Sequence, residues 1–253
     1  MPKLSRPFTL PDRSPLFKAP PRHYKGYRKL SLYCEASLTG IRKALPQDFE
    51  TASNIIEVFV MNCPEVHDLS NPEMGPRAYL EGGVVVQARY KDVLGGHVLY
   101  EYVTTDDALC GGREVWGYPK KLAKVSFEEA SGERIAASVE RLGKTLIDAR
   151  FAPGGGTAFE KPSLQPRLQV KRIPRVDGEG FDVDQIIYNE LAAPKLHERT
   201  AGTATVALGG SPIMDPLMEL GIARVVGAEF IVADFHLAYG RVYEDRLAAK
   251  VNA

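Results

Sequence analysis

Short stretches of alternating apolar and polar residues recur along most of the chain. In residues 29–36, Leu30, Leu32 and Cys34 form one face and their polar neighbours form the other. A period of two is typical of a strand with one buried face. Related stretches, separated by Gly, Asp or Asn turns, predict strands at 55–61, 84–90, 97–104, 125–128, 135–141, 145–151, 168–173, 184–191 and 203–208, before an apolar and aromatic run at 229–245.

Two short segments have helix signals instead. The first follows Ser37 or Thr39, either of which can cap it, and stops at Pro46, with an apolar stripe of Leu38, Ile41 and Leu45. The second is 215–220, after Pro212. The predicted fold class is therefore α+β and mainly β: an antiparallel, barrel-like core with a few short helices.

The N-terminal residues 1–26 differ from the rest of the chain in their proline content. Proline disfavours both helix and central strand, so we predict an extended arm over 1–26 and a single domain over 27–253. Such an arm either wraps the body or a neighbouring subunit, or is a plain flexible terminus. A length of 253 residues with 44% hydrophobic content suits one domain of ordinary size.

Composition argues for a small-molecule ligand. Lys plus Arg and Asp plus Glu both number 32, which disfavours a nucleic-acid or anionic-membrane partner. We find no signal-peptide core and no membrane-spanning window, so we expect a cytoplasmic protein. The 3 cysteines lack Cys-x-x-Cys spacing and the 5 histidines lack close ligand spacing, so we expect free thiols and no metal site.

The most informative motif is a pair of lysines, Lys120 and Lys121, directly after Tyr118-Pro119. A lysine amine attacks a ketone only when it is neutral, so a catalytic lysine needs a lowered pKa. Burial or a second cation lowers it. The aromatic and proline residues before the pair favour such an apolar setting over a solvated charge pair, and the glycines at 111, 112 and 117 permit tight turns.

The segment Gly112 to Leu122 resembles the signature of the acetoacetate decarboxylase superfamily, whose activated lysine is a standard example of this chemistry. Residues 38–46, 79–83 and 231–247 extend the resemblance in the same order along the chain. It implies an acetoacetate decarboxylase-like fold, no cofactor and a homo-oligomer.

The resemblance also implies roles for three residues. Lys120 would form the Schiff base, Lys121 would be the auxiliary cation, and Glu81 would move protons or orient the substrate. Successive residues of an extended chain point to opposite faces, so Lys121 can also point away from the amine. Glu81 before Gly82-Gly83 equally suits an exposed hairpin turn.

This sequence departs from the true decarboxylases at two positions. Their arginine before the first helix corresponds to Tyr27, with Arg28 one residue away, and their second glutamate corresponds to Phe59, with Glu57 two residues earlier. Arg28 substitutes only if the alignment contains a gap, because a slip of one residue reverses the face of a strand.

Tyr239 and Trp116 are further candidates for the substrate pocket. A phenol at Tyr239 can transfer a proton or orient a carboxylate, and core packing is the alternative for both side chains.

Three functions remain open from the sequence. The two departures favour an aldolase-dehydratase or hydratase that acts on 2-oxo acids such as pyruvate. Acetoacetate (3-oxo acid) decarboxylation is the alternative, and the third is a non-catalytic small-molecule-binding barrel.

Overall fold

A computed structural model describes residues 8–17, 19–70, 72–156 and 159–248. In this part of the chain, 13 strands form one sheet. The strands are β1 (Arg22–Glu35), β2 (Glu50–Asp68), β3 (Arg77–Tyr90), β4 (Val93–Val103), β5 (Lys120–Leu122), β6 (Lys124–Ala130), β7 (Arg134–Arg141), β8 (Lys144–Pro153), β9 (Arg167–Pro174), β10 (Phe181–Asn189), β11 (Leu191–Leu208), β12 (Arg224–Leu237) and β13 (Arg241–Asp245). The helical segments are α1 (Leu38–Ala44), η1 (Pro72–Met74), α2 (Asp106–Gly111), η2 (Gly112–Trp116) and η3 (Leu217–Leu220).

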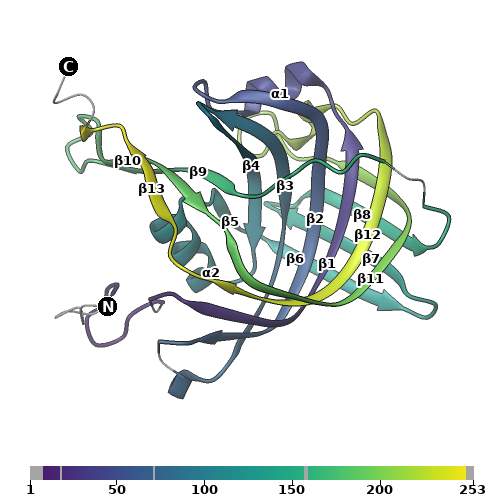
Figure 1. Ribbon diagram of the computed structural model, residues 1–253, viewed down its shortest axis with the longest axis horizontal. Helices are drawn as coiled ribbons and strands as arrows, with labels where there is room; N and C mark the ends of the chain where they lie inside the picture. The colour runs from purple at the N-terminus through teal and green to yellow at the C-terminus, as the bar shows by residue number, and fades with distance from the viewer. Residues whose placement is uncertain (1–7, 18, 71, 157–158, 249–253) are drawn as a thin grey trace.

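The sheet follows the order β13-β10-β9-β4-β3-β2-β1-β12-β11-β8-β7-β6, with β5 beside β4. Neighbouring strands are antiparallel except where β4 pairs with β5 and β9. The sheet is strongly curled (Figure 1), but in the described residues its order ends at β13 and β6 without joining them. The antiparallel, mainly β prediction is confirmed, and the sheet is barrel-like without being a closed barrel.

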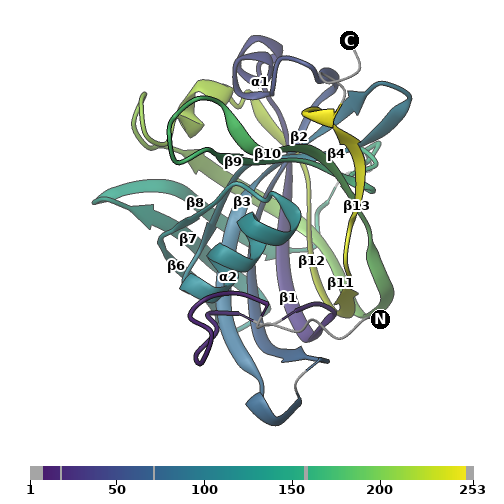
Figure 2. The ribbon, with the colours of Figure 1, turned by 90° about the vertical axis from the view of Figure 1, so that its left-hand side faces the viewer.

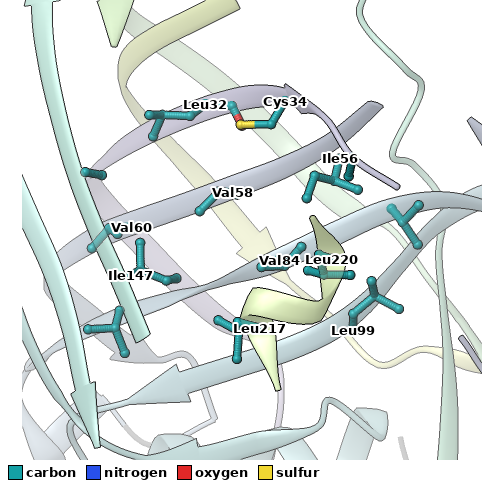
Figure 3. Close-up of a cluster of buried hydrophobic side chains, with 14 of the residues drawn as sticks. Leu32, Cys34, Ile56, Val58, Val60, Val84, Leu99, Ile147, Leu217 and Leu220 are labelled. Carbon is teal, nitrogen blue, oxygen red and sulfur yellow. The ribbon is translucent and has the colours of Figure 1, made fainter. Parts of the chain in front are cut away.

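The central strands bury both of their faces, because alternate side chains enter two different cores. Leu30 and Leu32 of β1 and Val58 and Val60 of β2 lie in the larger core, which also includes side chains of α1, η3 and β8 (Figure 3). The helix α1 begins after Ser37, whose side chain accepts a hydrogen bond from the Gly40 backbone N–H as predicted.

The opposite face of the same strands forms a smaller, aromatic core. Tyr27 of β1 and Phe59 of β2 lie there, together with Ala108 of α2 and Trp116 of η2. Figure 2 shows α2 in front of this side of the sheet, where it contacts β4 and β5. The candidate site lies in this second core.

Several predicted boundaries differ from the structure. The strand β1 begins at Arg22, so the last residues of the predicted arm at 1–26 already pair with β2 and β12. Residues 1–7 of that arm lie outside the described residues. The predicted helix at 215–220 is only the 3-10 turn η3, and the run 229–245 divides into β12 and β13.

The elements that were not predicted include α2, η1, η2, β5 and the first half of β11. Most residues of 192–201 are exposed, so the alternation that marks a strand is absent there. Among the described residues, none of the helices has the length and apolar character needed to span a membrane.

Candidate active site

The backbone around Lys120 is fixed by a helix, a left-handed glycine and a short strand. Gly112 has helical backbone angles and does not form the tight turn expected from the sequence. A Cβ at this position would come within 2.5 Å of the Lys120 side chain. Gly117 has a φ of 77°, and a Cβ at this position would lie only 2.8 Å from the Lys171 backbone, so this turn requires glycine. The following strand β5 places Lys120 beside Glu101 of β4.

Lys120 forms a buried ion pair with Glu81. The Lys120 Nζ donates to the Glu81 Oε2 at 2.6 Å, and the two residues are 7% and 3% exposed. The rings of Tyr79 and Tyr118 each lie 5.7 Å from this Nζ. Glu81 belongs to β3 and pairs with both neighbouring strands, so the hairpin-turn alternative for this residue is wrong.

Glu101 adds a second buried carboxyl group beside the same amine. Burial and the charge of Glu81 raise the pKa of Glu101 well above its ordinary value, which favours the protonated form of this carboxyl group. Burial lowers the pKa of Lys120, but Glu101 and Glu81 outweigh it, and the pKa is raised. The sequence predicted a lowered pKa for Lys120, and this prediction is wrong for the resting site. Its pKa is raised there, and Lys120 is an ammonium ion.

Lys121 points away from Lys120, as an extended strand allows. Its Nζ donates to the Asp215 Oδ1 at 2.8 Å and to the Met214 carbonyl, and its side chain is 35% exposed. The buried Asp215 also accepts a hydrogen bond from the Tyr102 hydroxyl. The structure thus does not bring Lys121 to the pocket as an auxiliary cation, because Asp215 holds it on the other side of β5.

A cavity of about 100 Å³ opens beside Lys120. Tyr27 and Phe59, which stand where the resemblance expects an arginine and a glutamate, both line it. Its other walls are mostly apolar or aromatic and include Tyr24, Met61, Tyr79, Val85, Val98, Tyr118, Leu191, Phe235 and Leu237.

Two further cations line the cavity, and neither was predicted. Lys29 Nζ donates to Glu57 Oε1 at 2.7 Å, and Arg167 Nη2 lies 3.8 Å from Glu57 Oε2. Burial opposes ionisation of Glu57, but Lys29 and Arg167 lower the pKa of Glu57 to about 2. Burial lowers the pKa of Lys29 against the attraction of Glu57. Glu57 therefore holds the two cations at the wall of the cavity.

The structure does not bring three of the predicted substrate-binding residues to this cavity. Arg28 lies on the opposite face of β1, where its guanidinium pairs with Glu129. Trp116 is buried but does not line the cavity, and its indole N–H donates to the Ala238 carbonyl. Tyr239 is 42% exposed and its ring meets that of Phe8, away from Lys120.

Sequence reasoning missed Glu101, Lys29 and Arg167. Glu101 left a readable signal, because it is a single carboxylate among the apolar residues 98–103 of a predicted strand. Lys29 was assigned to the polar face of its strand, but its side chain is only 16% exposed and lies close to Glu57 and Arg167. Among the described residues, no group of three or more His, Cys, Asp or Glu side chains is arranged to hold a metal ion.

Comparisons with known proteins agree with this geometry. A family model described as acetoacetate decarboxylase (ADC) matches residues 6–247. The acetoacetate decarboxylase of Acidiphilium cryptum (strain JF-5) is 27% identical over 252 residues, which cover 95% of this chain and 96% of that protein.

Solved structures show the same fold. An acetoacetate decarboxylase from Legionella pneumophila aligns with a TM-score of 0.81 and 23% identity, covering 98% of this chain and 99% of that chain. The enduracididine biosynthesis enzyme MppR complexed with pyruvate aligns with a TM-score of 0.80 and 15% identity, covering 94% and 98%.

Proposed function

The chain belongs to the acetoacetate decarboxylase family, and from this premise we propose that it is a lyase that forms a Schiff base between Lys120 and a small oxo acid. The observation that carries the proposal is the buried Lys120 amine, paired with Glu81 at 2.6 Å at the wall of a cavity. Curated relatives over nearly the whole chain are named as enzymes, which supports catalysis over mere binding.

The ion pair supplies a route to the neutral amine that the chemistry requires. When substrate displaces water, one proton passes from the Lys120 ammonium to the Glu81 carboxylate, which lies within hydrogen-bond reach. The amine then attacks the ketone carbon, the C–N bond forms as the C=O π bond breaks, and the former carbonyl oxygen takes the proton that the nitrogen releases. Loss of water from this carbinolamine gives an iminium, which accepts the electrons of a neighbouring bond.

Charge and volume support a small monocarboxylate as substrate. Three cations, Lys29, Lys120 and Arg167, face the two carboxylates Glu57 and Glu81, so the site carries one positive charge when Glu101 is in the neutral form that its raised pKa favours. A carboxylate ligand neutralises it. The cavity of about 100 Å³ is smaller than the engineered cavity of about 150 Å³ that holds benzene, which fits a substrate of a few carbon atoms.

Among oxo acids, we favour a 2-oxo acid such as pyruvate in an aldolase-dehydratase or hydratase reaction. Tyr27 and Phe59 line the cavity and lack the charges of the decarboxylase pattern. Loss of a proton from the iminium gives an enamine, which adds to an aldehyde, and water then leaves. The fold is shared with a protein complexed with pyruvate.

Acetoacetate decarboxylation is the second candidate, and two observations favour it. The curated relatives at 24–27% identity are named acetoacetate decarboxylase. Glu101 also gives the cavity a second carboxyl group despite Phe59. In this reaction the C–C bond to the carboxylate breaks, CO2 leaves and the enamine forms directly.

Side-by-side assays separate the two candidates. The purified protein should convert pyruvate and an aldehyde to a conjugated oxo acid, followed by its absorbance, and should release little CO2 from acetoacetate. A kcat/KM for CO2 release of about 10⁴ M⁻¹s⁻¹ or more, without any product from pyruvate and aldehyde, would establish the second candidate instead. No product from any oxo acid in a panel would leave the binding-barrel alternative.

Replacing Arg167 by leucine should weaken binding of the substrate carboxylate. We expect KM to rise about tenfold to a hundredfold, in line with a charged hydrogen bond worth roughly 1.5–3 kcal/mol, while Lys120 still forms its adduct. Arg172→Leu is the matched control on the same strand, because Arg172 is exposed and pairs with Asp184. Steady-state kinetics with both variants measures the effect, and an unchanged KM in Arg167→Leu would contradict the assignment.

The remaining expectations stay predictions. They are a cytoplasmic location, a homo-oligomer, the absence of nucleic-acid and membrane partners, and catalysis without a cofactor.

A further inference from the structure

Glu101 is 19 positions before Lys120 in the sequence, but the two residues are neighbours in the sheet. Its backbone pairs in parallel with that of Lys120, on neighbouring strands. The residue is 4% exposed, and it lines the same cavity as Lys120 and Glu81. The second carboxyl group therefore faces the space in which the substrate ketone would bond to Lys120.

One oxygen of Glu101 has no hydrogen-bond donor beside it. The carboxyl group interacts with that of Glu81, but its buried Oε2 accepts no hydrogen bond from any described residue, and a buried polar atom left unpaired costs roughly 1–3 kcal/mol. If this position had only a structural role, a hydrogen-bonded or apolar side chain would be more stable there than the Glu101 carboxyl group. An unpaired buried oxygen at a cavity wall suits a group whose partner is the substrate.

The neighbouring strand packs closely against the backbone of Glu101. Gly83 of β3 lies between Phe59 of β2 and Glu101 of β4 in the cross-strand register. A Cβ at Gly83 would come within 2.4 Å of the Tyr100 carbonyl oxygen and 3.2 Å of the Glu101 Cα. Glycine at this position therefore allows the close approach of β3 and β4 that places Glu101 at the cavity.

We propose that Glu101 is a further catalytic residue, the general acid that protonates the departing hydroxyl group of the Lys120 carbinolamine. The inference rests on the proposed Schiff-base function and extends it to a step that the two candidate reactions share. The groups that face Glu101 are Glu81, Lys120 and Arg167. Of these, Glu81 takes up the proton of Lys120 in the first step, and Glu101 is the other carboxyl group beside the amine that can supply a proton for water loss.

The step balances in protons and electrons. The Glu101 carboxyl group gives its proton to the carbinolamine oxygen, the C–O bond breaks and water leaves. The nitrogen lone pair forms the C=N bond of the iminium, and Glu101 remains as a carboxylate. When the iminium is hydrolysed at the end of the cycle, water adds to its carbon and gives a proton to Glu101, which regains its carboxyl group. The C=O bond then re-forms as the C–N bond breaks, and the nitrogen takes the hydroxyl proton and the proton held by Glu81, which restores the Lys120 ammonium and the Glu81 carboxylate.

Replacing Glu101 by glutamine tests the proposal, because the amide keeps the shape and cannot act as the acid. The rate of adduct formation is measured by mixing protein with pyruvate and with acetoacetate, quenching with sodium borohydride at increasing times, and weighing the intact protein. We expect the parent to accumulate the adduct and Glu101→Gln to do so about 10²–10⁴ times more slowly, the usual contribution of a general acid. Glu101→Asp should recover part of the rate.

Two controls separate catalysis from folding. Lactate, a 2-hydroxy acid that cannot form an imine, should bind the parent and Glu101→Gln with similar affinity in calorimetry. Glu140→Gln makes the same chemical change at an exposed position of β7 and should leave the adduct rate unchanged.

The outcomes distinguish this proposal from the one on which it rests. Equal adduct rates in the parent and Glu101→Gln would overturn only the role of Glu101. A parallel loss of lactate binding and adduct, with no recovery in Glu101→Asp, would overturn it in favour of a structural role. No adduct in the parent with either oxo acid would overturn the Schiff-base function and this inference together.

Discussion

Replacing Lys120 by alanine is expected to abolish turnover, with kcat/KM lower on the order of 10⁴-fold or more, because no other described amine is paired with Glu81 beside Glu101. The remaining carboxyl groups can still orient a substrate, but neither provides the electron sink of an iminium. Product formation from pyruvate with an aldehyde and CO2 release from acetoacetate should both disappear. Assays with each substrate measure the loss.

The adjacent lysine provides the control for this prediction. Lys121→Ala removes the same side chain one residue away, on the face of β5 where the amine is bound by Asp215. We expect this variant to retain adduct formation. If Lys120→Ala kept its turnover while Lys121→Ala lost it, the assignment of the nucleophile to the buried lysine would be contradicted.

Replacing Glu81 by glutamine should slow turnover about 10²–10⁴-fold, the range for a group that transfers a proton. The amide preserves the shape of the side chain but cannot accept the proton of Lys120. Stability should fall only slightly, because the amide oxygen can still accept the hydrogen bond from the Lys120 Nζ. Thermal unfolding and steady-state kinetics of the same preparation separate the two effects.

The pH dependence of kcat/KM should shift in a defined direction in Glu81→Gln. Burial lowers the pKa of Lys120, whereas Glu101 and Glu81 raise it, so removing the charge of Glu81 must lower it. The rise of kcat/KM with pH that reflects loss of the ammonium proton should therefore move to lower pH in Glu81→Gln. Full turnover at saturating substrate, or a shift to higher pH, would contradict a role for Glu81 in holding and accepting this proton.

The alternation of apolar and polar residues predicted much of the sheet, but it did not show which segments cover each face. In β1, Leu30 and Leu32 were correctly assigned to one face, yet the other face is also buried and holds Tyr27 and Lys29. Alternation shows which residues of a strand share a face. It does not show that distant segments such as α2 cover the second face.

The site was predictable where local sequence fixes geometry. The extended chain at Lys120 and Lys121 correctly suggested opposite faces. Counting along the resemblance correctly led to Tyr27 and Phe59 as side chains of interest at the cavity. Arg28, one residue further along β1, lies on the other face of the sheet, where its guanidinium pairs with Glu129.

The remainder of the site depends on tertiary contacts that a linear pattern does not contain. The pKa of Lys120 was expected to be lowered by burial or by the charge of Lys121, but Glu81 and Glu101 approach it from β3 and β4 and raise it. Arg167 enters from β9, whose parallel contact with β4 carried no sequence signal. Tyr239 follows the end of β12 and is directed to the surface.

The most direct test of the account is to locate the covalent adduct. The parent protein is treated with pyruvate or acetoacetate and sodium borohydride, digested and mapped by mass spectrometry, with Lys120→Ala and Lys121→Ala treated in parallel. The account predicts substrate mass on Lys120 in the parent and in Lys121→Ala, and no specific label in Lys120→Ala. Absence of the adduct in the parent with both oxo acids, or undiminished labelling of Lys120→Ala at another lysine, would contradict it.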